Sequence, residues 1–426
     1  MRTALLLLIV SLFAFHSSAQ TAVQYHGALS VVGSQIVNQH GQAVSFAGAS
    51  LFWSNNNWGG EAFYNASTVN WLKDDWNIEI VRAAMGVEDS GGYISDSTSN
   101  KAKVKTVVNA AINEGVYVII DWHSHHAENY QTEAIEFFEE MATLYGQYDN
   151  VIYEIYNEPL QVSWDNVIKP YANAVIAAIR AIDSTNLIIV GTPTWSQDVD
   201  VAAMNPITGY ANIAYTLHFY AATHGQWLRN KATAALNNGI ALMVTEWGTV
   251  SANGNGAVDS VSTADWMNFL CNNHLSHCNW AVNDKVEGAS ALVNGASTLG
   301  NWSSNDLTPS GTLVRKIVQD WNLNCNDTVM LSTSPIPSTA SVLSVEPFPN
   351  PVRASNLMEL RINNSMPQSI EVQWCTSWGA ILSKEVRQVS EGISNLKIHT
   401  PTVAAGIYFL IIATKEGRSV QKISVQ

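Results

Sequence analysis

The chain is poor in charge and in cysteine. Only 13% of its 426 residues are Asp, Glu, Lys or Arg, the formal net charge is −14, and no basic run occurs. Binding to nucleic acid or to an anionic membrane surface therefore has no electrostatic support. The four cysteines (Cys271, Cys278, Cys325 and Cys375) are too few for a disulfide scaffold and lack the spacing of zinc sites. In an oxidising compartment Cys271 and Cys278 are close enough in sequence to bridge, and two separate thiols are an equal expectation.

Long apolar runs are missing except at the N-terminus. Arg2 supplies a positive charge, Ala4–Phe15 is apolar with one exception, and Ser17–Ala19 offers small residues for cleavage. The run is shorter than the roughly 20 residues of a membrane-spanning helix. We therefore predict a removable signal peptide over residues 1–19, with Gln20 as the first residue of an exported chain.

Strand-like apolar runs alternate with segments that carry apolar residues at helical spacing, such as Lys103–Asn113 and Thr132–Tyr145. The runs are Val44–Leu51, Ile78–Met85, Tyr117–Trp122, Val151–Tyr156, Leu187–Val190, Ile213–Leu217, Ala241–Thr245 and Asn279–Val282. This alternation predicts an α/β fold, a (β/α)₈ TIM barrel, whose active site lies at the C-terminal ends of the strands. An open, doubly wound sheet is the alternative, but the glycine-rich phosphate loop typical of that fold is missing.

The two ends of the chain differ from this pattern. Residues 26–47 alternate apolar and polar side chains around two glycines, which predicts a hairpin that covers one end of the barrel. Residues 324–345 are rich in Ser, Thr and Pro and predict a linker. Residues 346–426 contain short alternating runs and predict a small antiparallel β-sandwich. The main domain is then expected over residues 20–323.

Two of the predicted strands end in a glutamate. Val151–Tyr156 is followed by Asn157 and Glu158, and Ala241–Thr245 is followed by Glu246. A single motif of this kind is ordinarily a helix cap beside a solvated glutamate. Two of them place both acids on the same rim of a parallel barrel, in a chain with 15 tryptophans. Paired carboxylates at a rim lined with indoles are the equipment of glycoside hydrolysis.

Other polar and aromatic residues fall at the ends of the predicted strands. They are Arg82, Asp121, Trp122, His123, Trp195, His218, Phe219, Tyr220 and Trp280. We expect Arg82 and Tyr220 to keep Glu246 ionised as a nucleophile, and we expect burial and the charge of Glu246 to raise the pKa of Glu158, the acid. Asn157 is expected to donate to the sugar 2-hydroxyl, and His123 and His218 are expected to bind sugar hydroxyls or orient the carboxylates. Trp58, Trp195 and Trp280 are expected to stack on pyranose rings.

A metal site seeded by His123, His125 and His126, with His218 in addition, is a weaker hypothesis, because no Asp or Lys at the end of a later strand accompanies His218. We predict that His125 and His126 are ordinary loop residues, and no cofactor is expected.

The segments GASLFWS, IVRAAMG, YVIIDWHSH, VIYEIYNEP, LHFYAATHG, VTEWGT and NWAVNDK resemble glycoside hydrolase family 5, and within it the endo-β-1,4-glucanases (cellulases). The resemblance runs from about residue 24 to residue 323. It implies a (β/α)₈ barrel, a retaining mechanism and no metal cofactor, with Glu158 as acid/base and Glu246 as nucleophile. The polar shell that it implies consists of Arg82, His123, Asn157, His218 and Tyr220. It also implies that Trp280 is a sugar platform and that Lys285 and Glu287 bind substrate. Asn55–Asn57 lengthen the loop before Trp58 relative to the family pattern.

The tail resembles a second family. PFPNPV at residues 347–352 and the terminal segment GIYFLIIATKEGRSVQKISVQ are similar to the C-terminal sorting domain of the type IX secretion system. The resemblance implies export across the outer membrane by that machinery, followed by release or attachment to the cell surface. A carbohydrate-binding module, with Trp374 and Trp378 stacked on sugar, is the alternative.

Together these features predict a secreted endo-β-1,4-glucanase, expected to be a monomer, that acts on cellulose or related β-glucans. Retention of configuration requires the carboxyl groups of Glu158 and Glu246 to be roughly 5 Å apart. Another retaining β-glycanase, acting on mannan, xyloglucan or mixed-linkage glucan, is an alternative. A surface glycan-binding protein without turnover is a further alternative, but it would not need both acids.

Overall fold

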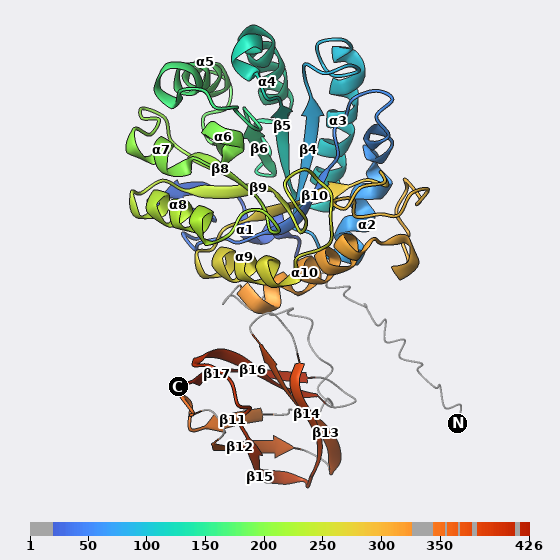
Figure 1. Cartoon of the computed structure of the whole chain (residues 1–426), viewed down its shortest axis with the longest axis vertical. Coiled ribbons are helices and arrows are strands. Elements are labelled where there is room, and N and C mark those ends of the chain that lie inside the picture. The colour runs from blue at the N-terminus through green and yellow to red at the C-terminus, as the bar shows by residue number, and fades with distance from the viewer. Residues whose placement is uncertain (1–19, 326–343, 354–355, 365–366, 377–380, 414–417) are drawn as a thin grey trace, which may run out of the picture.

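The computed structural model describes residues 20–325, 344–353, 356–364, 367–376, 381–413 and 418–426 (Figure 1). The predicted signal peptide and most of the predicted linker lie outside the described residues. Among the described residues, no helix is both long and apolar enough to cross a bilayer.

Eight parallel strands close into a barrel, so the predicted (β/α)₈ fold is confirmed. They are β3 (Ala47–Leu51), β4 (Ile80–Gly86), β5 (Tyr117–His123), β6 (Val151–Glu154), β7 (Ile188–Val190), β8 (Ile213–Tyr220), β9 (Leu242–Gly248) and β10 (His277–Val282). Each strand pairs with the next in sequence, and β10 closes the ring on β3. Every residue in these strands is buried, as expected for parallel strands covered on both faces.

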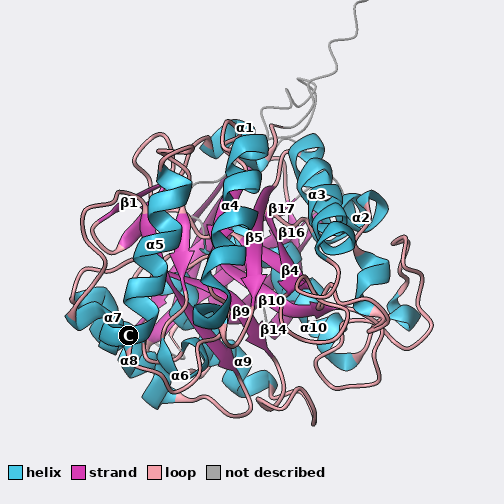
Figure 2. Ribbon diagram, turned by 90° about the horizontal axis from the view of Figure 1, so that it is seen from above, coloured by secondary structure: helices cyan, strands magenta, loops and turns pink. Residues whose placement is uncertain are grey.

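Helices surround the barrel (Figure 2). The longer ones are α2 (Ala66–Trp76), α3 (Ser97–Glu114), α4 (Gln131–Tyr145), α5 (Lys169–Arg180), α7 (Val199–Met204), α8 (Gln226–Asn237), α9 (Ser260–Asn272) and α10 (Pro309–Cys325). Short elements are α6 (Pro193–Ser196), η1 (Gly60–Phe63), η2 (Ala127–Tyr130), η3 (Trp164–Ile168) and η4 (Ser304–Asp306). Local sequence sets their ends: α3 begins where the Asp96 side chain accepts from Ser99 N–H, and it ends at Gly115, which adopts a left-handed φ of 68°.

The N-terminal segment covers one end of the barrel, as predicted. It consists of α1 (Ala22–His26) and the antiparallel hairpin of β1 (Ser30–Val32) and β2 (Gln35–Val37). Apolar side chains such as Leu29 and Ile36 join a cluster with residues near the N-terminal ends of the strands. Tyr117 Oη donates a 2.6 Å hydrogen bond to the carbonyl of Gly27, and this ties the cover to β5. The C-terminal ends of the strands are left for a site.

One disulfide links Cys271 at the end of α9 to Cys325 at the end of α10. Cys278 is a free, buried thiol. The expected alternatives for Cys271, a bridge to Cys278 or a free thiol, were therefore both wrong. The reason is topological: Cys278 lies in β10 among the apolar side chains inside the barrel, whereas α9 and α10 pack against each other on the outside.

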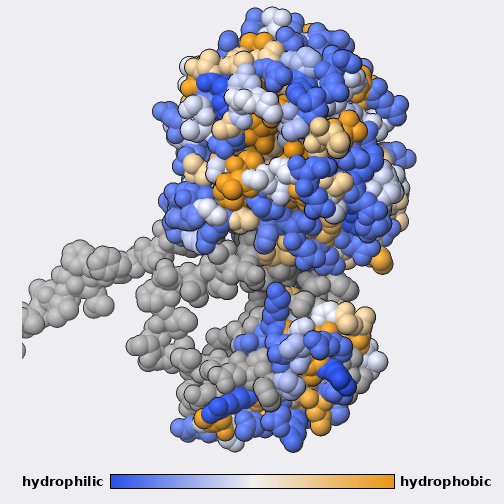
Figure 3. Space-filling view, turned by 90° about the vertical axis from the view of Figure 1, so that its left-hand side faces the viewer, coloured by the Kyte–Doolittle hydropathy of each residue, from blue (hydrophilic) through white to orange (hydrophobic). Residues whose placement is uncertain are grey.

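The C-terminal residues form two antiparallel sheets, so the predicted β-sandwich is confirmed. One sheet contains β11 (Ser344–Phe348), β12 (Leu357–Asn364) and β15 (Gly392–His399), and the other contains β13 (Gln368–Thr376), β14 (Ile381–Val389), β16 (Gly406–Ala413) and β17 (Arg418–Val425). Trp374 belongs to their shared core and is only 2% exposed, so it is not a sugar-stacking residue. Trp378 lies outside the described residues. The face seen in Figure 3 is mostly hydrophilic, with its apolar side chains in small groups.

Candidate active site

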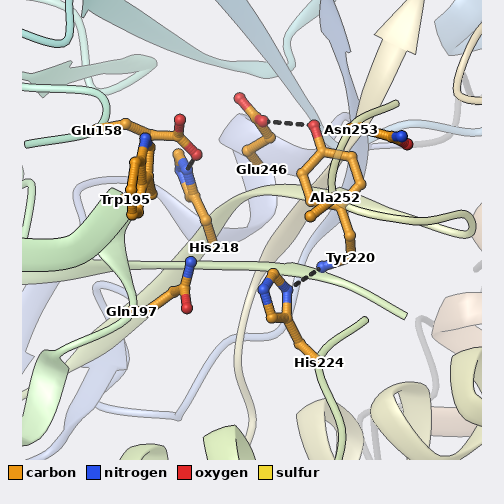
Figure 4. A pocket seen from close by; sticks show the side chains of 9 residues that line it. All are labelled: Glu158, Trp195, Gln197, His218, Tyr220, His224, Glu246, Ala252 and Asn253. Carbon is orange, nitrogen blue, oxygen red and sulfur yellow. Dashed lines mark hydrogen bonds and ion pairs between the residues drawn. The ribbon is translucent and has the colours of Figure 1, made fainter. Parts of the chain in front are cut away.

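The two glutamates predicted to meet do so at the C-terminal end of the barrel. Glu246 lies in β9, and Glu158 follows β6. A carboxylate oxygen of each and a ring nitrogen of His218 all lie within 4.8 Å of one another. They open into a cavity of about 440 Å³ (Figure 4). Its lining is Glu158, Trp195, Gln197, His218, Tyr220, His224, Glu246, Ala252 and Asn253. This separation suits a retaining glycosidase and is too small for the intervening water of an inverting one.

Glu246 is held by the two partners expected for it. Tyr220 Oη donates to Oε1 at 2.8 Å, and Arg82 Nη1 donates to Oε2 at 3.1 Å. Burial nevertheless raises the pKa of Glu246 above its ordinary value, and the negative charge of Glu158 adds to this rise. The opposing effects of His218, Arg82 and Tyr220 do not outweigh burial.

Glu158 lies between two imidazoles. Its Oε1 is 2.9 Å from Nδ1 of His218, and its Oε2 is 3.2 Å from Nε2 of His125. Burial alone would raise the pKa of Glu158, but the hydrogen bonds from His125 and His218 outweigh it and lower the pKa to about 2. Burial would lower the pKa of His218, but Glu246, Glu154 and Glu158 raise it to about 9.

Two expectations about this group were therefore wrong. The proton near Glu158 resides on His218 and not on the carboxyl group, because the two hydrogen-bonded imidazoles lower the pKa of Glu158 while the surrounding carboxylates raise the pKa of His218. His125 is not an ordinary loop residue, since it contacts the carboxylate. The ring of His126 instead lies near Glu128, with Nδ1 3.9 Å from Oε1.

Arg82 is the centre of a buried polar network. Its Nε donates to Glu154 at 2.8 Å, and its Nη2 reaches Asp121 at 2.9 Å and Asn157 Oδ1 at 2.7 Å. Asn157, predicted to bind a sugar hydroxyl, thus uses its side-chain oxygen to accept from Arg82. Sequence reasoning missed Glu154; its one signal was a carboxylate inside an otherwise apolar strand.

His123 supports an indole rather than a carboxylate of the pair. Its ring stacks on Trp280 with centroids 5.1 Å apart and an interplanar angle of 6°, and Nδ1 lies 2.7 Å from Asp121 Oδ2. Burial, together with Arg82, lowers the pKa of His123 well below its usual value, so this ring is neutral. Trp280 itself is only 6% exposed and can offer a small face to a ligand.

Two predicted platform residues are open to solvent. Trp195 is 39% exposed and lines the cavity beside Glu158, and Trp58 is 40% exposed and lies 5.5 Å from Trp53 between ring centroids. The asparagine-rich loop before Trp58 is anchored, because the buried Asn55 side chain donates to the carbonyls of Asp89 and Ser90.

The last loop of the barrel carries the two remaining predicted residues. Lys285 Nζ forms a 2.8 Å ion pair with Glu287 and lies 5.1 Å from the ring centroid of Phe52. The Lys285 side chain is more than half exposed, so its ammonium group can reach a ligand while it remains paired with Glu287.

The histidines proposed as a metal seed do not gather. Within the described part of the chain, three ligand-type side chains come together only at Glu158, His218 and Glu246. These are the groups of the carboxylate site itself, so His123, His125 and His126 do not form the cluster of the weaker metal hypothesis.

Two family models match the chain: cellulase (glycosyl hydrolase family 5) over residues 37–286, and the secretion system C-terminal sorting domain over residues 346–426. Endoglucanase Z of Dickeya dadantii is 58% identical over 326 residues, which are 76% of this chain and 74% of that protein. An endoglucanase of Clostridium saccharobutylicum is 46% identical over 310 residues, 71% of this chain and 67% of that protein.

Solved structures agree with the relatives. A structure from Cytophaga hutchinsonii matches with a TM-score of 0.69 at 53% identity, covering 71% of this chain and 97% of that one. The catalytic domain of Thermobifida fusca endoglucanase Cel5A matches with a TM-score of 0.67 at 31% identity, covering 70% and 99%.

Proposed function

Because this chain belongs to the cellulases of glycoside hydrolase family 5, we propose that Glu246 is the nucleophile and Glu158 the acid/base of its reaction. The chain is a retaining endo-β-1,4-glucanase, and its C-terminal sorting domain directs it to the type IX secretion machinery. The observation that carries the role assignment is the approach of a Glu158 oxygen and a Glu246 oxygen to within 4.8 Å.

In the first step Glu246 attacks the anomeric carbon of a glucosyl unit while the bond to the leaving oxygen breaks. Tyr220 and Arg82 hold one oxygen each of Glu246, so the carboxylate is oriented before substrate arrives. The leaving oxygen takes its proton from Glu158. His218, which shares a 2.9 Å hydrogen bond with Glu158, supplies that proton.

In the second step the ester formed on Glu246 is hydrolysed. Glu246 has lost its charge in the ester, so it no longer opposes ionisation of Glu158. The ionised Glu158 then removes a proton from water, and the water oxygen attacks the anomeric carbon from the face that the leaving group vacated. The net result is retention of configuration.

The substrate is a β-glucan, and we propose that Trp195 and Trp58 stack on its glucosyl rings. Both indoles are partly exposed, and Trp195 lines the cavity beside Glu158. We propose that Trp280, Lys285 and Glu287 complete the binding surface.

We further propose domain limits of 1–19, 20–323, 324–345 and 346–426. The second family match begins at residue 346, which supports the last limit, whereas α10 extends to Cys325, two residues past the proposed end of the catalytic domain. A monomer is proposed because Glu158, Glu246, His218, Tyr220 and Arg82 all come from one chain.

The test is a polysaccharide panel run on the wild type, Glu246→Gln and Glu158→Gln. We expect wild-type release of reducing ends to be highest on soluble cellulose derivatives, above mannan, xyloglucan and mixed-linkage glucan. Each Gln variant should lose about 10³-fold or more in kcat, with KM largely kept. Glu133→Gln on the outer helix α4 is the control and should match the wild type. Turnover that survives in Glu246→Gln would remove the proposed mechanism.

A further inference from the structure

The proposed acid/base, Glu158, contacts a second imidazole besides that of His218. This imidazole belongs to His125, in the loop after β5, and it has no role in the reaction steps given above. His218 Nδ1 lies at Oε1 of Glu158, and His125 Nε2 lies at Oε2, at 2.9 and 3.2 Å. The His218 side chain is 2% exposed and the His125 side chain is 32% exposed. One imidazole therefore holds Glu158 from inside the barrel, and the other holds it from the solvent side.

His125 is fixed by its backbone. Its N–H donates to Glu88 Oε1 at 2.8 Å, and its carbonyl accepts from Tyr156 Oη at 3.0 Å. The N–H of Glu158 donates to the carbonyl of Ser124 at 3.2 Å, which ties the loop after β5 to the acid's own backbone. The ring of His125 lies 5.7 Å from the ring of Trp53. Hydrogen bonds on both sides of His125 therefore fix its backbone and place its ring beside Glu158.

The chemistry of the site gives this contact a use. Glu158 must carry a proton in the first step and must be ionised in the second. Each carboxylate oxygen has two lone pairs, so a ring N–H on each oxygen still leaves a lone pair free for the leaving oxygen or for water. Two donors on opposite oxygens also fix the rotation of the carboxyl group, which a single donor does not.

Resting on the role proposed for Glu158, we propose that His125 is a positioning residue that orients the Glu158 carboxyl group and favours its ionised, base form. Burial lowers the pKa of His125, but the hydrogen bond and charge of Glu158, with Glu88 and Glu246, outweigh this effect and raise it. When His125 is protonated, its ring puts a positive charge next to the Glu158 carboxyl group. The ionisable groups that interact electrostatically with this pair are Glu88, Asp121, His123, His218, Tyr220, His224 and Glu246.

The test compares His125→Leu, His125→Asn and the matched control His126→Leu. Leu removes both the donor and the charge, whereas Asn keeps an N–H donor without the charge. Active sites are counted by covalent trapping with an activated 2-deoxy-2-fluoro-cellobioside, so that each rate refers to folded, competent enzyme.

For His125→Leu we expect kcat on a soluble cellulose derivative to fall by about 10- to 100-fold, part of the contribution of general acid–base catalysis, with KM within about twofold. The alkaline limb of kcat/KM should move to higher pH, because loss of the nearby positive charge makes the Glu158–His218 pair hold its shared proton more tightly. His125→Asn should restore much of kcat but keep the displaced limb. His126→Leu should match the wild type in both measurements.

The step affected can be separated with aryl cellobiosides. A dinitrophenolate leaves without needing a proton. The kcat of His125→Leu on a dinitrophenyl cellobioside therefore reports the second step, in which Glu158 acts as base. We expect that rate to fall as well. A His125→Leu enzyme with wild-type kcat and an unmoved alkaline limb would overturn the inference and leave the roles of Glu158 and Glu246 intact. Survival of activity in Glu158→Gln or Glu246→Gln would instead overturn the proposed function.

Discussion

Arg82 Nε donates a 2.8 Å hydrogen bond to Glu154 Oε2, and solvent reaches neither side chain. The same guanidinium contacts Asp121 and, through Nη1, the proposed nucleophile Glu246. Glu154 also accepts from Thr245 Oγ1 at 2.6 Å. Because Glu154 binds the guanidinium group at Nε, it holds Nη1 in position to donate to Glu246. The position of the nucleophile thus depends on a carboxylate that does not face the cavity.

Glu154→Gln should destabilise the fold and slow the reaction. Removing one partner of a buried ion pair costs about 3–5 kcal/mol, and Arg82 loses the group that orients it. We expect a lower Tm in thermal unfolding and a lower kcat. Asp75→Asn, which breaks the part-exposed pair with Arg315, is the control and should cost below about 1 kcal/mol. A Glu154→Gln enzyme with wild-type Tm and kcat would show that Arg82 is held by its other partners alone.

The barrel and its two carboxylates were predictable from the sequence because both follow from periodicity. Eight buried runs separated by helical segments leave few folds, and parallel strands bring their C-terminal ends to one rim. Glu158 and Glu246 therefore had to share a rim wherever the helices packed. Glu154 was not predictable, since its partner Arg82 is assigned only by the pairing of neighbouring strands around the closed barrel.

Features that depend on loop conformation, helix packing or competing electrostatic effects could not be predicted from the sequence. His125 follows a strand by two residues, where no periodicity indicates direction. The bridge from Cys271 to Cys325 depends on how α9 and α10 pack. The position of the proton near Glu158 depends on whether burial, which raises the pKa of Glu158, or its two hydrogen bonds, which lower it, have the larger effect. That balance depends on distances that the sequence does not give.

The alkaline limit of activity should report His218. Its pKa is raised from 6.5 to about 9, so its protonated form stabilises the fold fully below pH 6.5, and that contribution is lost as the pH rises through 9. Above about pH 9 neither His218 nor Glu158 holds the proton for the leaving oxygen. We therefore expect both Tm and kcat/KM to fall as the pH is raised through this range. In His218→Gln, the fall of Tm between about pH 6.5 and 9 should be absent. If the variant shows the same dependence of Tm on pH as the wild type, a different group causes the fall.

Loss of the disulfide should affect stability and spare catalysis. Cys271 and Cys325 are 54 residues apart in sequence, and closing a loop of that length removes unfolded-state entropy worth about 4 kcal/mol. Both cysteines lie at helix C-termini, at the end of the barrel away from the strand ends that carry the site. Cys271→Ser with Cys325→Ser should lower Tm and leave kcat at 25 °C unchanged. The wild type under reducing conditions should behave in the same way, and a matching loss of kcat would contradict this separation.

The backbone of the turn that carries Trp195 is strained. Thr194, Trp195 and Ser196 have φ values of 61°, 54° and 56°, a left-handed conformation that costs non-glycine residues of order 1–3 kcal/mol each. Hydrogen bonds to the segment after β6 hold the turn, from Trp195 N–H to Pro159 O at 2.8 Å and from Ser196 Oγ to Asn157 O at 2.7 Å.

Trp195→Asn should separate binding from stability, because Asn adopts left-handed conformations more readily than Trp but offers no flat apolar face. We expect KM for cello-oligosaccharides to rise about tenfold, equivalent to about 1.4 kcal/mol, while Tm stays level or increases. Trp227→Asn is the matched control, since Trp227 is also exposed, at 48%, but does not line the cavity. Its KM should equal the wild-type value. A Trp195→Asn enzyme with unchanged KM would mean that the strained turn serves a purpose other than presenting the indole to glucan.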